Sequence, residues 1–154
     1  MNIFTEATSS LNKAILHTSI DLLSRREHSK KELKEKLLIR DFSLDDIVIV
    51  IEYLISENYL SEERFADSVF RSRVGKGYGW RYIKSELAQK GVPNDIVQNL
   101  SLNCQIDWYL QAEQAYNKRF GASLIKDQKD KAKRMRFMQR RGFDMDEIMV
   151  LLNA

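Results

Sequence analysis

The sequence predicts an all-α protein made of three tandem copies of a three-helix unit. Three observations support this prediction. The 154 residues include one proline and six glycines, too few for the many turns of an all-β fold. An apolar pattern recurs about every fifty residues, with helix-start signals between its members. The hydrophobic fraction of 44% is enough to fill a core and argues against a wholly disordered chain.

The repeated unit is seen in apolar residues at matching positions. The first copy contains Leu33, Leu37, Phe42 and Ile47. The second copy, about fifty residues on, contains Ile83, Leu87, Val92 and Ile96, and the third contains Met138, Phe143 and Ile148. Upstream, two more sets are spaced by about fifty residues: Ile20, Phe70 and Phe120, and Leu16, Ala66 and Tyr116. We therefore predict a tail at 1–10 and three-helix repeats at 11–59, 60–103 and 104–154.

Helix-start signals divide each copy into three helices. Ser29 and Glu32 have the spacing of a capping box, and Asp127 and Asp130 repeat it. Capping or acidic groups at Ser43, Asn94 and Asp144 indicate further starts. Pro93 supports one of them, because a proline at the first helical position loses no needed hydrogen bond. We expect Asn58 to end a helix in the left-handed conformation and Ser61 to begin the next, with three apolar side chains facing inward: Phe65, Val69 and Phe70.

The segment Ile47–Ile51 is β-branched throughout, and its local propensity favours a strand. The equivalent stretches, Ile96–Leu102 and Ile148–Leu152, have helical spacing without such a run. We therefore predict a helix here as well.

The basic residues are concentrated in three windows, although the formal net charge is only +3. Arg25–Arg40, Arg71–Lys90 and Lys118–Arg141 contain 23 of the 25 Lys and Arg residues but only 6 of the 22 acids. Each window covers the end of the first helix, the loop and the second helix of its repeat. If the repeats stack regularly, the windows align into one basic face that attracts phosphates or carboxylates. The alternative for each single window is a solvated helix face.

Aromatic residues lie within the middle window, at Tyr78, Trp80 and Tyr82. Exposed aromatic rings among cations can stack on bases or anchor a protein interface. The alternative for Trp80 is a packing role that fastens one repeat to the next.

No catalytic or cofactor-binding pattern is found. Gly75-Lys-Gly-Tyr-Gly79 lacks the phosphate-loop spacing and follows no strand, so we interpret it as a flexible interhelical loop in which Lys76 can touch a polyanion. His17 and His28 lack neighbouring ligands for a metal, and Cys104 lacks a basic activator in sequence. We predict a protein without enzymatic activity, cofactor or metal. The single cysteine, the absence of a secretion signal and the short apolar runs predict a cytosolic chain with no membrane partner.

Four segments carry a resemblance to a known family: Leu22–Leu33, Asn58–Asp67, Arg71–Gly79 and Ile83–Gly91. In these segments the chain resembles the RecX recombination regulators, and the resemblance extends over about residues 12–152. Trp80 departs from the pattern, because a proline follows the Gly-Tyr-Gly in many relatives.

The resemblance implies three three-helix repeats in an elongated, curved array. It also implies a non-enzymatic partner of the RecA recombinase that lodges in the groove of the RecA–DNA filament. There it would restrain filament growth, ATP hydrolysis and strand exchange. We further expect the protein to be a monomer. From their places in the basic windows, we expect these residues to contact RecA or DNA: Arg25, Arg26, Lys30, Lys31, Lys34, Arg71, Arg73, Lys76, Tyr78, Trp80, Arg81, Lys84, Lys133, Arg134, Arg136, Arg140 and Arg141.

Two other functions fit parts of the sequence. A general DNA-binding module would contact phosphates through the basic second helices. A nuclease or resolvase would need clustered carboxylates to hold a metal, whereas the acids here lie mostly at helix starts away from the basic windows. A repeat scaffold for another acidic protein is the remaining alternative.

Overall fold

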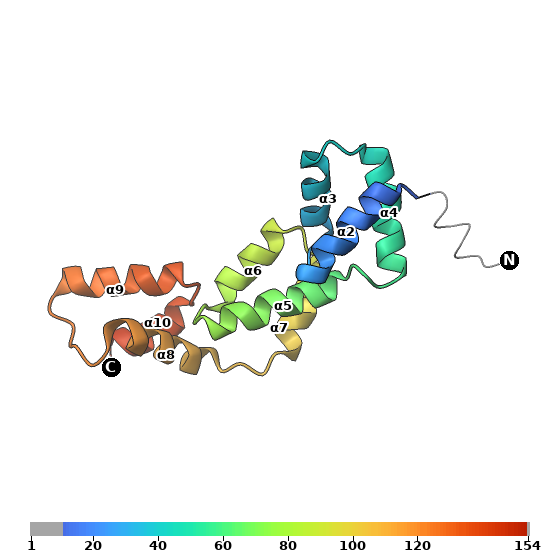
Figure 1. Ribbon diagram of the computed structural model, residues 1–154. Helices are drawn as coiled ribbons and strands as arrows, with labels where there is room; N and C mark the ends of the chain where they lie inside the picture. The colour runs from blue at the N-terminus through green and yellow to red at the C-terminus, as the bar shows by residue number, and fades with distance from the viewer. Residues whose placement is uncertain (1–10, 154) are drawn as a thin grey trace.

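The computed structural model describes residues 11–153, and the regular secondary structure within them is all helical. The nine helices of this range form three groups of three that follow one another along an elongated, bent array (Figure 1). The predicted tail at 1–10 lies outside the described residues. The first group is α2 (Lys13–Arg25), α3 (Lys30–Ile39) and α4 (Leu44–Ser56). The second is α5 (Glu62–Gly75), α6 (Trp80–Gln89) and α7 (Asn94–Asn103), and the third is α8 (Trp108–Phe120), α9 (Gln128–Arg140) and α10 (Met145–Leu152).

Each three-helix unit has its own hydrophobic core, and the repeat pattern supplies it. Leu37, Leu87 and Met138 are each fully buried at the same position of the second helix. Burial departs from the repeat pattern at two positions. Val97, at 4% exposure, is buried in the core of the second unit, whereas Ile96, the member of the pattern, is only partly buried. Ile20 is 40% exposed, whereas its counterpart Phe70 is buried.

Residues at the ends of the units pack across the expected boundaries. Leu60 belongs to the core of the first unit, while Ile106 and Trp108 pack against the core of the second. Trp108 and Trp80 both make edge contacts with Phe70, with ring centroids 6.2 Å apart in each pair. Trp80 is therefore half-buried in an aromatic cluster where the second unit meets the third, as the packing interpretation of this residue expected.

Most helix starts form where the capping residues predicted them. Ser29, Ser43, Ser61 and Asp127 each accept a hydrogen bond from a backbone N–H of the first turn. Asp144 and Glu147 form a complete capping box. The box expected at Ser29 is only half made, because the Glu32 carboxylate turns away to bind Arg26. Pro93 stands one residue earlier than expected, at the N-cap of α7.

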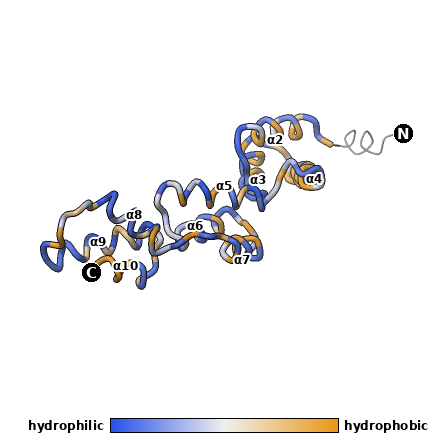
Figure 2. The backbone as a smooth tube through the Cα atoms, turned by 90° about the horizontal axis from the view of Figure 1, so that it is seen from below, coloured by the Kyte–Doolittle hydropathy of each residue, from blue (hydrophilic) through white to orange (hydrophobic). Residues whose placement is uncertain are grey.

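The β-branched segment is helical, as predicted, and forms the middle of α4. Ile47, Val50 and Ile51 are buried, whereas Val48 and Ile49 are 42% and 49% exposed. Burial of one helical face thus outweighs the local preference for a strand. Figure 2 shows α4 as a predominantly hydrophobic stretch. No helix within residues 11–153 is both long and apolar enough to cross a membrane. The predicted left-handed residue after this helix is also found, since Asn58 has φ 61°.

A candidate polyanion-binding face

The basic windows occupy equivalent places in the three units. Each covers the end of the first helix, the connecting loop and the second helix, which is α3, α6 or α9. In Figure 1, α6 and α9 lie above the first helices of their units, and α3 lies in the upper part of the first unit. The second helices therefore follow the same side of the array, which brings the basic windows into one series.

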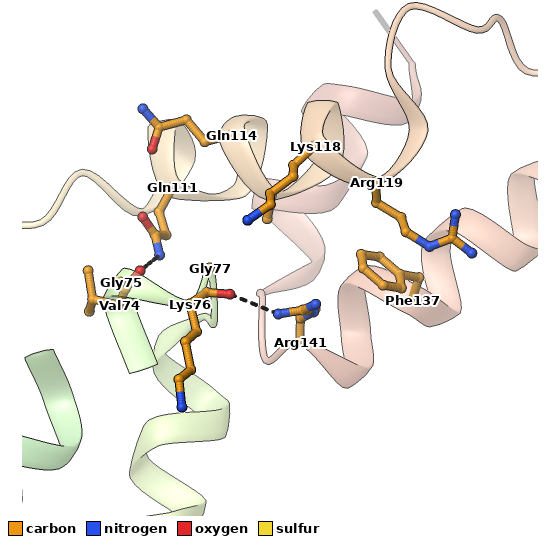
Figure 3. A pocket seen from close by; sticks show the side chains of 11 residues that line it. Val74, Gly75, Lys76, Gly77, Gln111, Gln114, Lys118, Arg119, Phe137 and Arg141 are labelled. Carbon is orange, nitrogen blue, oxygen red and sulfur yellow. Dashed lines mark hydrogen bonds between the residues drawn. The ribbon is translucent and has the colours of Figure 1, made fainter. Parts of the chain in front are cut away.

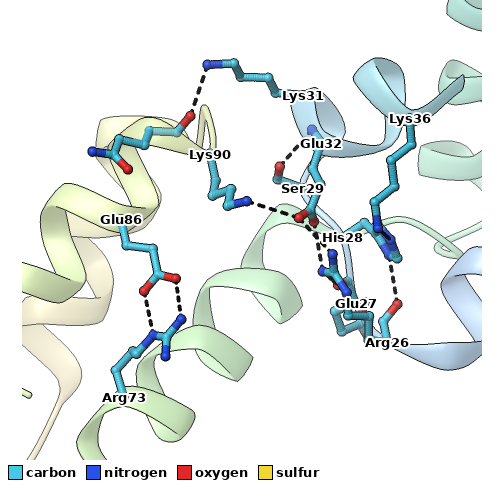
Figure 4. Close-up of polar contacts among 11 residues, drawn as sticks. Arg26, Glu27, His28, Ser29, Lys31, Glu32, Lys36, Arg73, Glu86 and Lys90 are labelled. Atoms are coloured by element: carbon cyan, nitrogen blue, oxygen red, sulfur yellow. Dashed lines mark hydrogen bonds and ion pairs between the residues drawn. The ribbon is translucent and has the colours of Figure 1, made fainter. Parts of the chain in front are cut away.

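At the junction of the first and second units, several cations are neutralised by carboxylates (Figure 4). The buried Glu32, at the start of α3, receives two hydrogen bonds from Arg26 at 2.9 and 2.8 Å. Lys90, at the end of α6, approaches the same carboxylate at 3.3 Å. Burial alone would raise the pKa of Glu32, but the hydrogen bonds and charges of Arg26 and then Lys90 outweigh it. They lower the pKa to about 2.

A second ion pair continues this junction along the second unit. Arg73 binds Glu86 through two hydrogen bonds, each 2.7 Å long, and the hydrogen bonds to Glu86 raise the pKa of Arg73. Both pairs border one groove of about 270 Å³ between the units. Lys31 crosses the junction separately, with its ammonium 3.0 Å from the carbonyl oxygen of Gln89. Lys90 and Lys31 therefore join the first two units, whereas the Arg26 and Arg73 pairs each lie within one unit.

At the junction of the second and third units, two backbone segments come into direct contact. The N–H of Gly79 donates to the carbonyl of Arg141 at 2.7 Å, and that of Arg81 donates to the carbonyl of Gly142 at 3.0 Å. A Cβ atom at Gly142 would collide with the backbone of Tyr82, and φ there is +93°. The side chains of Arg81 and Asp144 pair across the same contact. Glycine at position 142 thus permits the close approach.

A cavity of about 390 Å³ opens beside this contact (Figure 3). Its lining comes from the loop after α5, from α8 and from the end of α9. The Arg141 guanidinium donates to the Lys76 carbonyl at 2.9 Å and lies 4.6 Å from the centre of the Tyr78 ring. Figure 3 shows the Lys118 ammonium directed into this space and Arg119 beside Phe137. The side chain of Lys76 extends away from these cations, so this residue lines the cavity mainly through its backbone.

The structure separates the predicted contact residues other than Arg134 into three groups. The predicted cations without an ion pair in the described residues are the partly exposed Lys34 and the exposed Lys30, Lys31, Lys76, Lys84, Lys133, Arg136 and Arg140. Cations held in pairs are Arg25 with Asp21, Arg26 with Glu32, Arg71 with Asp67, Arg73 with Glu86 and Arg81 with Asp144. Tyr78, Trp80 and Arg141 are half-buried in the contact between the second and third units.

Arg134 corrects the prediction, because its side chain is only 3% exposed and cannot form part of a contact face. It donates to the hydroxyl of Tyr116 at 2.7 Å and to the carbonyls of Ser123 and Leu124. It also pairs with Asp130. Arg134 therefore fixes the loop between α8 and α9 inside the third unit.

Two residues were missed as site candidates, Lys118 and Arg119. Both lie in the third basic window, and both line the cavity between the second and third units. In the sequence they are visible only as members of a charged window. Their position beside the cavity depends on the packing of α8 against α9, which a count of charges does not contain.

The described part of the chain contains no group of three His, Cys, Asp or Glu residues arranged to hold a metal. His28 is buried, with its imidazole bound to the Arg26 carbonyl and to Lys36. Cys104 is a free, half-buried cysteine that donates to the carbonyl of Ser101. These side chains are thus engaged in structural contacts.

The fold and this face define a class, the tandem helical-repeat proteins that present a series of basic surfaces. Family models for the first, second and third three-helix domains of RecX match residues 16–54, 61–99 and 107–152. The chain therefore belongs to the RecX family.

Individual relatives agree with this assignment over most of their length. The chain is 38% identical to the regulatory protein RecX of Vibrio vulnificus, covering 88% of this chain and 89% of the relative. It is also 38% identical to the regulatory protein RecX of Serratia proteamaculans, covering 87% and 93%. The crystal structure of RecX from Lactobacillus salivarius shares the fold, with a TM-score of 0.73 at 20% identity, over 92% of this chain and 94% of that one. Both of these sequence relatives are named regulatory proteins, and membership of their family supports a regulatory role for this chain.

Proposed function

We propose that this protein binds the RecA–DNA filament and restrains its extension, its ATP hydrolysis and strand exchange. In this proposal the basic face lodges in the filament groove. The observation that carries it is the recurrence of cations without an ion pair on the second helix of all three units, as at the partly exposed Lys34 and the exposed Lys84 and Arg136. Family membership gives the regulatory role, and RecA is the partner that the RecX resemblance implies.

The elongated shape supports a mechanism that needs no chemistry on the nucleotide. Three units in series can bridge neighbouring subunits of a filament, while their cations meet acidic protein surface or bound DNA. A ligand that fits one filament geometry shifts the population of filaments toward that geometry. RecA would then hydrolyse ATP more slowly, because the bound protein stabilises one geometry of the filament. In this mechanism the protein acts as a cytosolic monomer without a cofactor.

A general DNA-binding module is the second candidate. The unpaired cations favour it, since lysines and arginines without internal partners are free to replace counterions along a phosphate backbone. Binding of this kind would depend strongly on salt and would not require RecA.

The DNA-dependent ATPase activity of RecA tests the two functions together. Protein is added at less than one copy per RecA, and its DNA binding alone is measured at two salt concentrations. Inhibition at substoichiometric protein supports action on the filament, because a competitor for DNA must occupy the strand. An unchanged ATPase rate with tight, salt-sensitive DNA binding would instead establish the DNA-binding module.

A further inference from the structure

The two junctions between units differ in how their cations are balanced. At the first junction, Glu32 binds Arg26 and Lys90, and Glu86 binds Arg73. At the second, the cavity is lined by cations from α8 and α9, and none of its described lining residues is acidic. The first junction thus has a complete set of charges, whereas the second has an uncompensated positive cluster.

Three cations form this cluster: Lys118, Arg119 and Arg141. Among residues 11–153, no carboxylate oxygen lies within 4.0 Å of their side-chain nitrogens. The guanidinium carbons of Arg119 and Arg141 lie 5.5 and 5.2 Å from the centre of the same ring, that of Phe137. Figure 3 shows the Phe137 ring between Arg119 and Arg141, with Lys118 on the same side of the ring as Arg141. An anion in the cavity is stabilised by these cations, since the described lining offers them no carboxylate.

The surroundings hold Arg141 and the cavity walls in place. Arg141 is fixed by the Lys76 carbonyl and by the Tyr78 ring. The amide of Gln111 donates to the carbonyls of Val74 and Tyr78, which fastens α8 to the loop that forms the opposite wall. The volume of about 390 Å³ lies within the range of small-ligand sites. The cavity is therefore a formed site rather than a chance grouping of surface lysines.

We propose that the cavity between the second and third units binds a phosphate group. An ammonium and guanidinium groups lining one cavity favour phosphate over carboxylate, since phosphate offers more acceptor oxygens and more charge, and the arginine fork matches its geometry. The phosphate can belong to a nucleic-acid strand or to a free nucleotide. The strand source rests on the proposed function, because it makes the cavity one fixed point along the basic face.

Titration with inorganic phosphate tests the site without DNA or RecA. The backbone amides of Gly75 and Gly77, on the cavity wall, are followed by NMR. We expect their shifts to saturate in the wild-type protein and to be lost in the double variant Lys118→Gln/Arg119→Gln. Both side chains are exposed, so the variant should keep its melting temperature. Shifts that persist in the variant, or that never saturate in the wild type, would overturn the proposal.

A matched variant separates a site from general charge. Lys126→Gln/Lys129→Gln removes two exposed cations from the same unit outside the cavity. With an oligothymidylate, we expect the cavity variant to bind about 10-fold more weakly, and the matched variant, which lies in the same basic window, to lose less affinity. The dependence of log K on log salt should also become shallower by about 0.7 in the cavity variant, as for one phosphate contact on a single strand. Equal losses in the two variants would contradict a phosphate site.

Two further titrations identify the source. The concentrations of oligothymidylate and of ATP that half-saturate the shifts of the two glycine amides are compared. A lower value for oligothymidylate assigns the phosphate to a strand. A lower value for ATP assigns it to a nucleotide. Acetate acting as strongly as phosphate would overturn the assignment in favour of an acidic protein contact. If the phosphate titration fails, the wild-type protein can still inhibit RecA. If the protein does not inhibit RecA, the phosphate titration can still succeed. The two proposals are therefore tested independently.

Discussion

At the scale of single residues, two buried ionisable side chains stand at the first junction. His28, 1% exposed, has Nδ1 3.0 Å from the Arg26 carbonyl and Nε2 2.8 Å from the Lys36 ammonium. An ammonium only donates, so Nε2 accepts, Nδ1 carries the proton and the imidazole is neutral. Burial lowers the pKa of His28, and the hydrogen bond to the Arg26 carbonyl opposes this only in part.

His28 should make the fold sensitive to mild acid. Because its folded pKa lies below its unfolded value of about 6.5, its contribution to stability is present above that pH and is lost as the pH falls. We expect the melting temperature to drop between pH 7.5 and 5.5 in the wild type, and to drop less in His28→Gln. Thermal unfolding at several pH values measures this. An equal drop in both proteins would show that another group titrates.

Glu32 acts over a lower pH range. Its folded pKa of about 2 lies below the unfolded value of about 4.3, so its contribution is complete above the latter and disappears toward pH 2. Glu32→Gln should lower the free energy of unfolding by roughly 1–3 kcal/mol at pH 7 and by much less at pH 2.5. Urea unfolding at the two pH values measures the difference. Glu35→Gln, an exposed residue of α3, is the control and should have little effect.

At the scale of elements, the contact between the start of α6 and the end of α9 depends on two glycines. A Cβ at Gly79 would meet the carbonyl of Gly142, and a Cβ at Gly142 would meet Tyr82. The two backbone hydrogen bonds, from Gly79 to Arg141 and from Arg81 to Gly142, thus bring the two segments closer than a Cβ atom at either glycine would allow. These glycines set how the third unit sits on the second.

Gly142→Ala should therefore weaken this contact. The substitution adds both the clash and the cost of a positive φ, together about 1–3 kcal/mol or more. We expect a lower melting temperature and faster proteolysis within the third unit. Gly75→Ala, where a Cβ meets nothing within 4 Å, should leave both unchanged or slightly improved. A Gly142→Ala protein as stable as Gly75→Ala would contradict the close contact.

The fold could be predicted from the sequence because its elements are local and repeated. The same buried position is apolar in all three copies, at Leu37, Leu87 and Met138, and capping residues mark most helix starts. The site could be predicted only in part. Glu32 and Lys90 are 58 residues apart, and no local pattern pairs them. Arg134 looks like any other cation in its window, yet the loop after α8 folds back to bury it.

At the scale of the whole molecule, the basic face is a property of three units acting together. Lys34 and Lys84 stand at the same repeat position, fifty residues apart, and Arg136 lies on the corresponding helix of the third unit. None of the three has an ion pair within the described range. By contrast, Arg71 and Arg73 already bind Asp67 and Glu86, so changing them would disturb the fold as well as the face.

Neutralising one such cation in each unit tests whether the face is continuous. We expect Lys34→Gln, Lys84→Gln and Arg136→Gln each to weaken inhibition of the RecA ATPase, and the triple variant to show the sum of the three free-energy changes, since distant sites are additive. Lys13→Gln removes an exposed cation outside the three basic windows and should inhibit nearly as the wild type does. Circular dichroism and melting temperature should be unchanged in the triple variant and in Lys13→Gln. If one substitution alone accounts for the whole loss, a single unit makes the contact and the other two serve only to position it.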